Sequence, residues 1–268
     1  MLKKRVITAI IALPLLFAAV IINKYIFFCA LCLISIIGLY EYYSAAGKTG
    51  AKPMIGLGVV SGLVLLLLTL FGGNINYMTL FIAIIMLIVL SVPIFSNRYN
   101  FLSSAVTIIG VLYLPFLFRY LYLIRAIQNT GVYLIWFVFI VAWMSDTFAY
   151  FTGRAFGRNK LCPAISPKKT VEGSIGGIIG STVGCIIYGL LLAKYNIIDI
   201  HVIDLLIIGI SGSIISQIGD LAASAIKRNA GIKDYGNIMP GHGGVLDRFD
   251  SILFAAPLVY YYIAYIIR

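Results

Sequence analysis

Charged residues are scarce in this chain of 268 amino acids, and acidic residues are the scarcest of them. Charged side chains make up 11% of the sequence, hydrophobic side chains make up 62%, and the mean hydropathy is +1.04. Soluble globular domains are roughly a quarter charged and about half apolar. The composition therefore excludes an ordinary soluble domain and predicts an all-α integral membrane protein.

Cysteine is also rare, with four residues in the whole chain. Cys29 and Cys32 form a C-x-x-C pair, but they lie within the apolar run "IFFCALCLISIIGLY". A redox pair would need the surroundings of a soluble βαβ fold, which this run does not provide. We interpret both as small apolar side chains of a buried helix and expect no disulfide framework.

Apolar runs long enough for membrane helices are abundant. The N-terminal run resembles a signal peptide, but no clear A-x-A site follows it, so we interpret it as a retained first helix. The second run is short for a span and could instead form a re-entrant hairpin with the first. We expect about nine spans, near residues 6–22, 26–40, 54–71, 79–95, 101–118, 131–150, 173–193, 203–219 and 251–267.

The distribution of Lys and Arg tests this count, because basic residues concentrate in cytoplasmic loops. With nine spans and a cytoplasmic N-terminus, 15 of the 20 basic residues fall in cytoplasmic segments and the other five in outer segments. This bias supports a multi-pass protein of the cell membrane. It also attributes most of the net charge of +11 to topology, so we expect no nucleic-acid partner.

The nine acidic residues divide the chain into two parts. Residues 1–125 contain only Glu41, and we expect them to be transmembrane helices that act as a scaffold, face lipid and form a dimer interface. Residues 126–268 contain the other eight, of which Asp199 and Asp204 fall in an expected outer loop. The remaining six lie at expected cytoplasmic ends of helices, so residues 126–268 are the expected catalytic region, facing the cytoplasm.

Glycines recur at small-x-x-x-small spacing in the run "GSIGGIIGSTVGCIIYGLLLA". Gly173 and Gly177, Gly176 and Gly180, and then Gly184 would let two helices approach closely. We interpret these glycines as packing residues.

Asp220 is the first candidate for chemistry. It follows a long apolar run in "SQIGDLAASAIKR", where Ser216, Asp220, Ser224 and Lys227 share one helical face. A carboxylate near the membrane boundary requires compensation. A metal ion could supply it, and so could a structural pair with Lys227.

The stretch "PGHGGVLDRFD" is the second candidate. Asp247 and Asp250 would lie on the first turn of the last helix, a position that also suits a purely structural acidic start. Magnesium prefers oxygen ligands, usually one or two carboxylates with substrate phosphates, and Asp220 with Asp247 would fit. A lone His242 is more often structural than a ligand, although the neighbouring glycines would allow close approach of a substrate.

The third candidate is "GRAFGRNKLCPAISPKKTVEGSIGG", which matches neither a Walker A nor a Rossmann fingerprint. It gathers basic side chains, including Lys168 and Lys169, and its charge could also be topological. Ser166 and Pro167 predict a helix N-cap and first helical position. Basic residues beside a helix N-terminus form an anion site. Together the three stretches predict phosphoryl or nucleotidyl transfer on a lipid phosphate.

The same residues resemble a known family, the polytopic phosphatidate cytidylyltransferases, also called CDP-diacylglycerol synthases. The family pattern of S, K-R, K-D, P-G-H-G-G, D-R and D is complete here, and the stretches "SDTFAYFTGRAFGRNKL" and "SPKKTVEG" are also similar. The matching residues are Ser224, Lys227, Arg228, Lys233, Asp234, Pro240 to Gly244, Asp247, Arg248 and Asp250.

The resemblance implies that CTP and phosphatidic acid give CDP-diacylglycerol and pyrophosphate with Mg²⁺, a second cation being left open. It implies Asp220 and Asp247 as metal ligands, with Asp146 and Asp250 as further ligands or supporting residues. Phosphate-neutralising roles follow for the basic residues, namely Lys168, Lys169, Lys227, Arg228, Lys233 and Arg248. It also suggests a homodimer.

Two other functions remain open at this point. A CTP-dependent kinase of polyprenol or another lipid alcohol would also use CTP, but would transfer its γ-phosphoryl group to the alcohol. An ion-coupled transporter would use Asp146 and Asp220 as a relay, but transporter sites usually lie at the bilayer midplane between repeats. A CDP-alcohol phosphotransferase is less favoured, because its D-G-x-x-A-R motif is absent.

Overall fold

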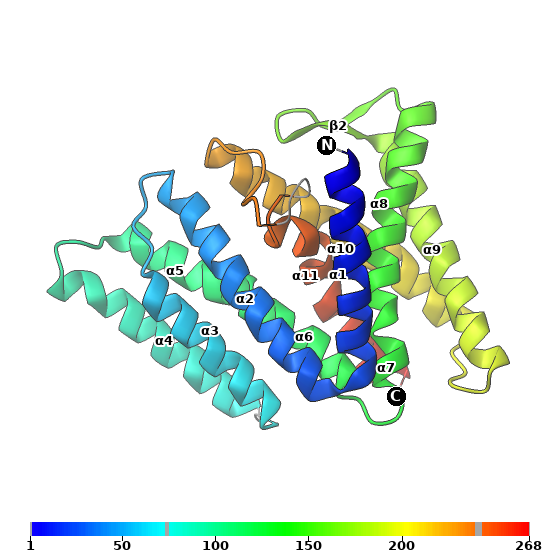
Figure 1. Ribbon diagram of the computed structural model, residues 1–268, viewed down its shortest axis with the longest axis horizontal. Helices are drawn as coiled ribbons and strands as arrows, with labels where there is room; N and C mark the ends of the chain where they lie inside the picture. The colour runs from blue at the N-terminus through cyan, green and yellow to red at the C-terminus, as the bar shows by residue number, and fades with distance from the viewer. Residues whose placement is uncertain (1, 73–74, 239–242, 268) are drawn as a thin grey trace. The chain divides into compact units, whose positions relative to one another are not determined.

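The computed structural model describes residues 2–72, 75–238 and 243–267, without the side chains of residues 2–9, 11, 13 and 75. Helices dominate it (Figure 1). They are α1 (Leu2–Ile22), α2 (Lys24–Gly47), α3 (Ile55–Leu70), α4 (Ile75–Phe95), α5 (Phe101–Tyr113), α6 (Pro115–Arg125), α7 (Gly131–Leu134), α8 (Trp136–Phe156), α9 (Val171–Lys194), α10 (Val202–Asn229), α11 (Leu246–Tyr262) and the π-helix η1 (Ile263–Ile267). Strands β1 (Lys160–Cys162) and β2 (Ser166–Thr170) form one small antiparallel sheet.

Each of the nine apolar runs coincides with one helix or with two consecutive helices. Among the described residues, seven segments are long and apolar enough to cross a membrane, and they confirm a multi-pass helical membrane protein. The short second run is part of α2, whose 24 residues suffice for a span. Helix α3 has only 16 residues. The number of nine spans and the orientation of the termini remain predictions.

The chain forms two compact units, each built from two segments of sequence. The first unit comprises residues 1–123 and 226–248, and the second comprises residues 124–225 and 249–268. The first boundary lies close to the one expected at residue 125, but the segment 226–248 belongs with the N-terminal helices. Helices α10 and α11 therefore each contribute residues to both units.

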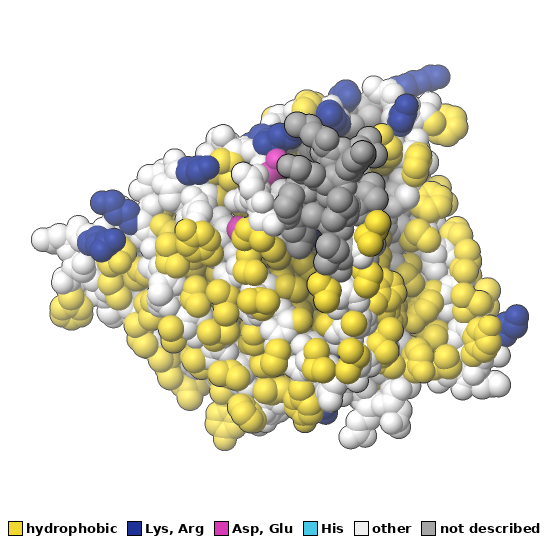
Figure 2. Space-filling view, viewed as in Figure 1, with side chains coloured by type: hydrophobic (Ala, Val, Ile, Leu, Met, Phe, Trp, Pro, Cys, Tyr) yellow, Lys and Arg dark blue, Asp and Glu magenta, His cyan; other side chains and the backbone are white. Residues whose placement is uncertain are grey.

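Tyr43 of α2 organises the interior of the first unit. Its side chain is 1% exposed, and its hydroxyl donates a 2.9 Å hydrogen bond to the carbonyl oxygen of Thr107 in α5. A Cβ at Gly58 of α3 or at Gly110 of α5 would come within 2.1 Å or 2.5 Å of the Tyr43 ring or hydroxyl. Glycine at both positions therefore lets α3 and α5 close around one tyrosine. Most outward-facing residues of α4 are apolar, and hydrophobic side chains cover this region at the lower left of Figure 2.

Glycines set the packing of α8 against α9 in the second unit, where the two helices run side by side (Figure 1). A Cβ at Gly173 would lie 2.7 Å from the carbonyl oxygen of Ala149, and one at Gly177 would lie 2.8 Å from that of Ser145. At Gly180 the obstacle would be the ring of Phe148, at 2.2 Å. The interpretation of these glycines as packing residues is confirmed.

The expected helix start at Ser166 and Pro167 is wrong. Both residues lie in β2, and α9 begins at Val171 with Thr170 as its N-cap. The Thr170 side chain accepts a 3.1 Å hydrogen bond from the backbone N–H of Gly173. Proline is tolerated in β2 because both strands of a two-stranded sheet are edge strands.

We expect Gly177→Ala to lower the free energy of unfolding by about 1–3 kcal/mol, because the new Cβ would press on the backbone of α8. Thermal unfolding in detergent measures this change. Gly56→Ala on α3 is the matched control, since nothing lies within 4 Å of its added Cβ. Equal midpoints for the two variants would contradict the close α8–α9 approach.

Candidate active site

The second unit contains a pocket of about 330 Å³ that several charged side chains line. The pocket is bounded by the C-terminal halves of α8 and α10, by the N-terminus of α9 and by the β1–β2 hairpin. Its lining residues are Asp146, Ala149, Tyr150, Gly153, Arg154, Leu161, Lys168, Lys169, Thr170, Gly173, Ser174, Gln217 and Asp220. The sequence candidates Asp146, Lys168, Lys169 and Asp220 thus face a common cavity.

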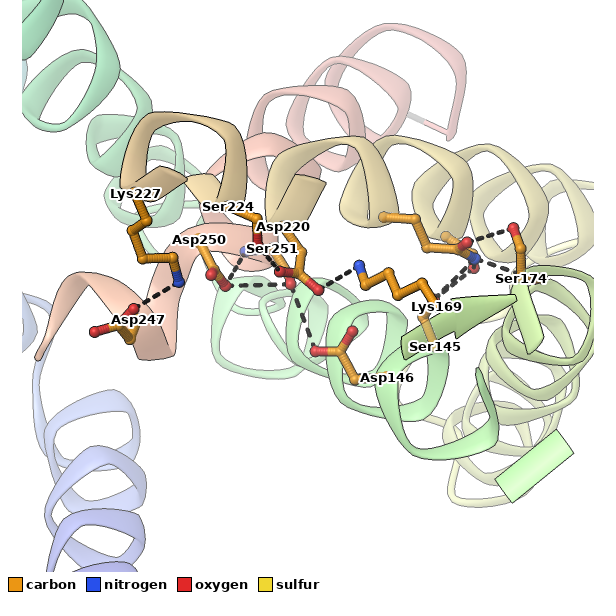
Figure 3. Close-up of polar contacts among 12 residues, drawn as sticks. Ser145, Asp146, Lys169, Ser174, Asp220, Ser224, Lys227, Asp247, Asp250 and Ser251 are labelled. Carbon is orange, nitrogen blue, oxygen red and sulfur yellow. Dashed lines mark hydrogen bonds and ion pairs between the residues drawn. The ribbon is translucent and has the colours of Figure 1, made fainter. Parts of the chain in front are cut away.

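An ion pair joins Lys169 of β2 to Asp220 of α10 across this pocket (Figure 3). Both side chains are about three-quarters buried, with relative exposures of 26% and 24%. The Ser224 hydroxyl, one turn further along α10, lies 3.4 Å from the other Asp220 oxygen. A structural pair with Lys227, seven residues further along α10, was one of the two arrangements considered for Asp220, and the structure does not form it. The hairpin brings Lys169 to the carboxylate, while Lys227 pairs elsewhere.

Asp146 of α8 lies near a second group of oxygen atoms. The Ser251 hydroxyl lies 3.4 Å from Asp146 Oδ2 and 3.4 Å from Asp250 Oδ1 (Figure 3). The Asp250 carboxylate also accepts a 2.8 Å hydrogen bond from the backbone N–H of Ser251. Because α11 begins at Leu246, Asp250 lies in its second turn rather than in the expected first turn.

A network of hydrogen bonds forms the floor of the pocket. Gln217 of α10 accepts a hydrogen bond from the Ser174 hydroxyl of α9, and its amide nitrogen donates to the Ser174 carbonyl oxygen at 3.1 Å. The same nitrogen lies 3.3 Å from the Ser145 hydroxyl of α8 and 3.2 Å from that of Ser213. Gln217 therefore ties together the three helices that carry the pocket. Sequence reasoning missed it, although it stands three residues before Asp220.

Glu172 holds the basic loop that precedes the hairpin. Its carboxylate accepts hydrogen bonds from the backbone N–H groups of Arg158 and Asn159, each at 3.1 Å. The Asn159 side-chain amide adds a third hydrogen bond at 2.9 Å. The loop is therefore anchored to the first turn of α9, beside the helix N-terminus that lines the pocket. Donor groups at a helix N-terminus and nearby cations suit an anionic ligand.

The first unit contains a separate buried ion pair, between Lys227 and Asp247 (Figure 3). Lys227 Nζ lies 2.7 Å from Asp247 Oδ1, and the other carboxylate oxygen accepts hydrogen bonds from the backbone N–H groups of Tyr235 (2.8 Å) and Gly244 (2.9 Å). The Lys227 ammonium also lies 5.4 Å from the centre of the Tyr235 ring. The Asp247 side chain is only 2% exposed, so this pair is well shielded from solvent.

Glu41 was not among the sequence candidates, yet the first unit places it at the start of α11. One carboxylate oxygen accepts a 3.0 Å hydrogen bond from the N–H of Val245, and the other accepts a 2.8 Å bond from that of Leu246. Only one signal pointed to it, namely that it is the single acidic residue among the first 125. More than 200 residues separate the partners, so no local pattern could have paired them.

The other sequence candidates lie at the surface or outside the described residues. Arg228, Lys233 and Arg248 are exposed, as suits residues that meet a soluble anion. An Arg228 guanidinium nitrogen donates to the carbonyl oxygen of Ile232 at 3.1 Å. His242 lies outside the described residues, so its expected role stays a prediction.

The residues of the second unit fit a magnesium ion. Asp146 and Asp220 both line the pocket, and Mg²⁺ is commonly held by one or two carboxylates together with substrate phosphates and water. Within the described residues, no three His, Cys, Asp or Glu side chains form a group that could hold a metal by themselves. Asp220 and Asp247 belong to different units, so their sharing of one ion stays a prediction.

These features define a class of protein: a multi-pass membrane protein with a pocket whose cations and carboxylates suit a phosphate-bearing ligand. Comparison with known proteins narrows the class. The model of the Cytidylyltransferase family matches residues 3–266. The chain therefore belongs to the cytidylyltransferase family, a family of nucleotidyltransferases.

Relatives in three bacteria are similar over nearly their whole length, and each is named phosphatidate cytidylyltransferase. The protein of Staphylococcus saprophyticus is 38% identical over 262 residues, covering 96% of this chain and 97% of the relative. That of Staphylococcus haemolyticus is 36% identical with the same coverage. That of Bacillus subtilis is 33% identical over 270 residues, covering 98% and 97%. The resemblance seen in the signature residues is thus confirmed across both halves of the chain.

We expect Glu172→Gln to loosen the basic loop and to increase tryptic cleavage after Arg158 several-fold, because the amide cannot accept all three hydrogen bonds. Helix α9 should persist, since Thr170 still caps it. Timed proteolysis of the protein in detergent measures the effect. Asp199→Asn removes the same charge from an exposed loop and serves as the control; equal cleavage rates in both variants would rule out the anchor.

Proposed function

We propose that this protein is a phosphatidate cytidylyltransferase, which converts CTP and phosphatidic acid to CDP-diacylglycerol and pyrophosphate. The observation that supports this most strongly is the pocket of the second unit, where cations, carboxylates and a helix N-terminus line one cavity in a membrane protein. The names of the full-length relatives agree with this substrate pair. An enzyme of this kind serves phospholipid biosynthesis.

In the proposed reaction, a phosphate oxygen of phosphatidic acid attacks the α-phosphorus of CTP. The new P–O bond joins the lipid phosphate to the cytidylyl group, and the bond to the β-phosphate breaks with pyrophosphate as the leaving group. Catalysis of such a step consists mainly of positioning and of neutralising the charge that develops on oxygen. Lys168 and Lys169 are suited to hold the phosphates in the pocket.

Asp146 and Asp220 are the residues that we propose to hold Mg²⁺ in this pocket. When bound, the ion would screen the phosphate oxygens and favour departure of pyrophosphate. In the structure the Asp220 carboxylate is engaged by Lys169. Binding of a metal and a nucleotide would therefore release the Lys169 ammonium from Asp220 and make it available to a phosphate. A requirement for a second cation remains open.

The residues around Lys227 and Asp247, in the first unit, belong to the signature that resembles the family. We propose that Lys227, Arg228, Lys233 and Arg248 neutralise substrate phosphates, and that Asp247, Asp250 and Ser224 support the site. Exposure of Arg228, Lys233 and Arg248 is compatible with contact to a soluble nucleotide.

The location and assembly of the protein are proposals as well. The excess of Lys and Arg in loops expected on the inner side supports a multi-pass protein of the cell membrane whose active site faces the cytoplasm, where CTP is present. A homodimer is proposed from the family resemblance. Chemical crosslinking in native membranes tests the dimer.

We expect purified protein with Mg²⁺, phosphatidic acid and CTP labelled at the α-phosphate to transfer the label to lipid and to release pyrophosphate. CTP labelled at the γ-phosphate should leave the lipid unlabelled, because that phosphate departs with pyrophosphate. Thin-layer chromatography of the lipid fraction measures both. The reverse pattern, with label from the γ-phosphate appearing on a lipid alcohol, would instead establish the kinase.

We expect Asp220→Asn to lower kcat by about 100-fold and to raise the Mg²⁺ concentration needed for half-maximal activity, because the amide is a poorer metal ligand than the carboxylate. Steady-state rates at increasing Mg²⁺ measure both quantities. Asp199→Asn, in an exposed loop of the same unit, is the control. An unchanged Mg²⁺ dependence in Asp220→Asn would exclude Asp220 as a ligand.

A further inference from the structure

Glu41 is a buried carboxylate in α2, within a segment long and apolar enough to cross a membrane. Its residue is 3% exposed, and its two oxygens accept hydrogen bonds from the backbone N–H groups of Val245 and Leu246. A carboxylate in such surroundings is costly unless donors compensate its charge. Both oxygens are therefore committed to the segment that leads into α11.

The first N–H groups of a helix have no partner within the helix and carry a partial positive charge. The N–H groups of Leu246, the first residue of α11, and of Val245, directly before it, donate to Glu41, and the N–H of Gly244 donates to Asp247. Three consecutive backbone donors are thus divided between two carboxylates. The position of the Asp247 side chain and the position of the Glu41 carboxylate are set by the same short piece of backbone.

Two glycines beside Glu41 leave the space that its carboxylate occupies. A Cβ added at Gly236 would lie 2.6 Å from Glu41 Oε1, and one added at Gly244 would lie 2.5 Å from the same atom. At each position the three nearest atoms all belong to Glu41, so nothing else restricts these two glycines as closely. Gly236 and Gly244, both between α10 and α11, therefore pack closely against the carboxylate.

We propose that Glu41 is a positioning residue for the signature segment. Its ionised carboxylate fixes the backbone at 244–246, and this backbone holds Asp247 against Lys227. The proposal rests on the proposed function, because it takes Asp247 and Lys227 to serve the cytidylyltransferase reaction. It assigns the one acidic residue of the N-terminal helices a role in that reaction without contact with substrate.

The test compares Glu41→Gln with Tyr43→Phe. Glutamine keeps the volume of the side chain, but its amide group would face one of the two N–H donors. Tyr43→Phe removes a buried hydrogen bond from the same helix, two residues away, without touching residues 244–246. It therefore controls for a general loss of stability. Asp247→Asn serves as the reference for loss of the positioned group.

Hydrogen–deuterium exchange of the peptide covering residues 243–248 reports the position of the segment independently of activity. We expect Glu41→Gln to speed exchange there at least tenfold and to lower kcat at least tenfold, with a smaller change in the KM for CTP. Tyr43→Phe should change neither quantity by more than about twofold, whatever its thermal midpoint. Glu41→Asp should recover part of both losses, because it restores the charge.

Gly236→Ala provides a second route that leaves Glu41 in place. Its added Cβ should displace the carboxylate and reproduce both effects, and the two substitutions combined should be less harmful than the product of their separate effects. If Glu41→Gln fails to fold, Gly236→Ala alone keeps the test decisive, because it leaves Glu41 ionisable and displaces only its position.

Unchanged hydrogen–deuterium exchange at residues 243–248 in Glu41→Gln would overturn the positioning role. The same conclusion would follow if Glu41→Gln had the kcat of Tyr43→Phe while Asp247→Asn was inactive. Full activity of Asp247→Asn would instead show that Asp247 takes no part in the reaction. The inference would then fail, because it assumes that Asp247 serves the reaction. Absence of CDP-lipid formation by the unmodified protein would refute the proposed function itself, and the exchange data would still report whether Glu41 orders the segment.

Discussion

An ionised carboxylate is costly in an apolar environment unless a cation or several N–H donors surround it. This constraint determines how the few acidic residues of the protein are used. Asp247 is held by one ammonium and two backbone N–H groups, Asp220 by the Lys169 ammonium, and Glu41 by two N–H groups at a helix start. The carboxylates of Asp220 and Glu41 join segments far apart in the sequence, whereas Asp247 joins the end of α10 to the start of α11. The polar regions of both units contain these carboxylate contacts, and the apolar helices hold the contacting residues in place.

The helical architecture was accessible from the sequence because its causes are local. Long apolar runs predict membrane helices from length and composition alone, and each run coincides with helical structure. The close approach of α8 and α9 was also predictable, because Gly177 and its neighbours repeat at the spacing of one helix face. The signature around Asp247 indicated the family, and the match over residues 3–266 confirmed it.

The partners of the site residues could not be predicted from the sequence in the same way. Lys227 was one candidate partner of Asp220, beside a metal ion, because both lie on one face of α10, but a helix brings its own residues together only every three or four positions. Lys169 reaches Asp220 through a hairpin that the sequence did not predict, since "SPKKT" suits an edge strand as well as a helix start. Glu41 meets α11 through tertiary structure alone. Side-chain pairing across more than 200 residues leaves no periodic signal.

The charges that line the pocket favour a substrate that arrives with a cation. Arg154, Lys168 and Lys169 face two carboxylates, Asp146 and Asp220, so the pocket has only one excess positive charge. A nucleoside triphosphate carries several negative charges, and the pocket alone would leave most of them unbalanced. A divalent ion would supply part of the missing positive charge, and Asp146 and Asp220 are the residues that we propose would hold it. The Lys169–Asp220 ion pair is thus best understood as the resting arrangement of two groups that the proposed reaction would separate.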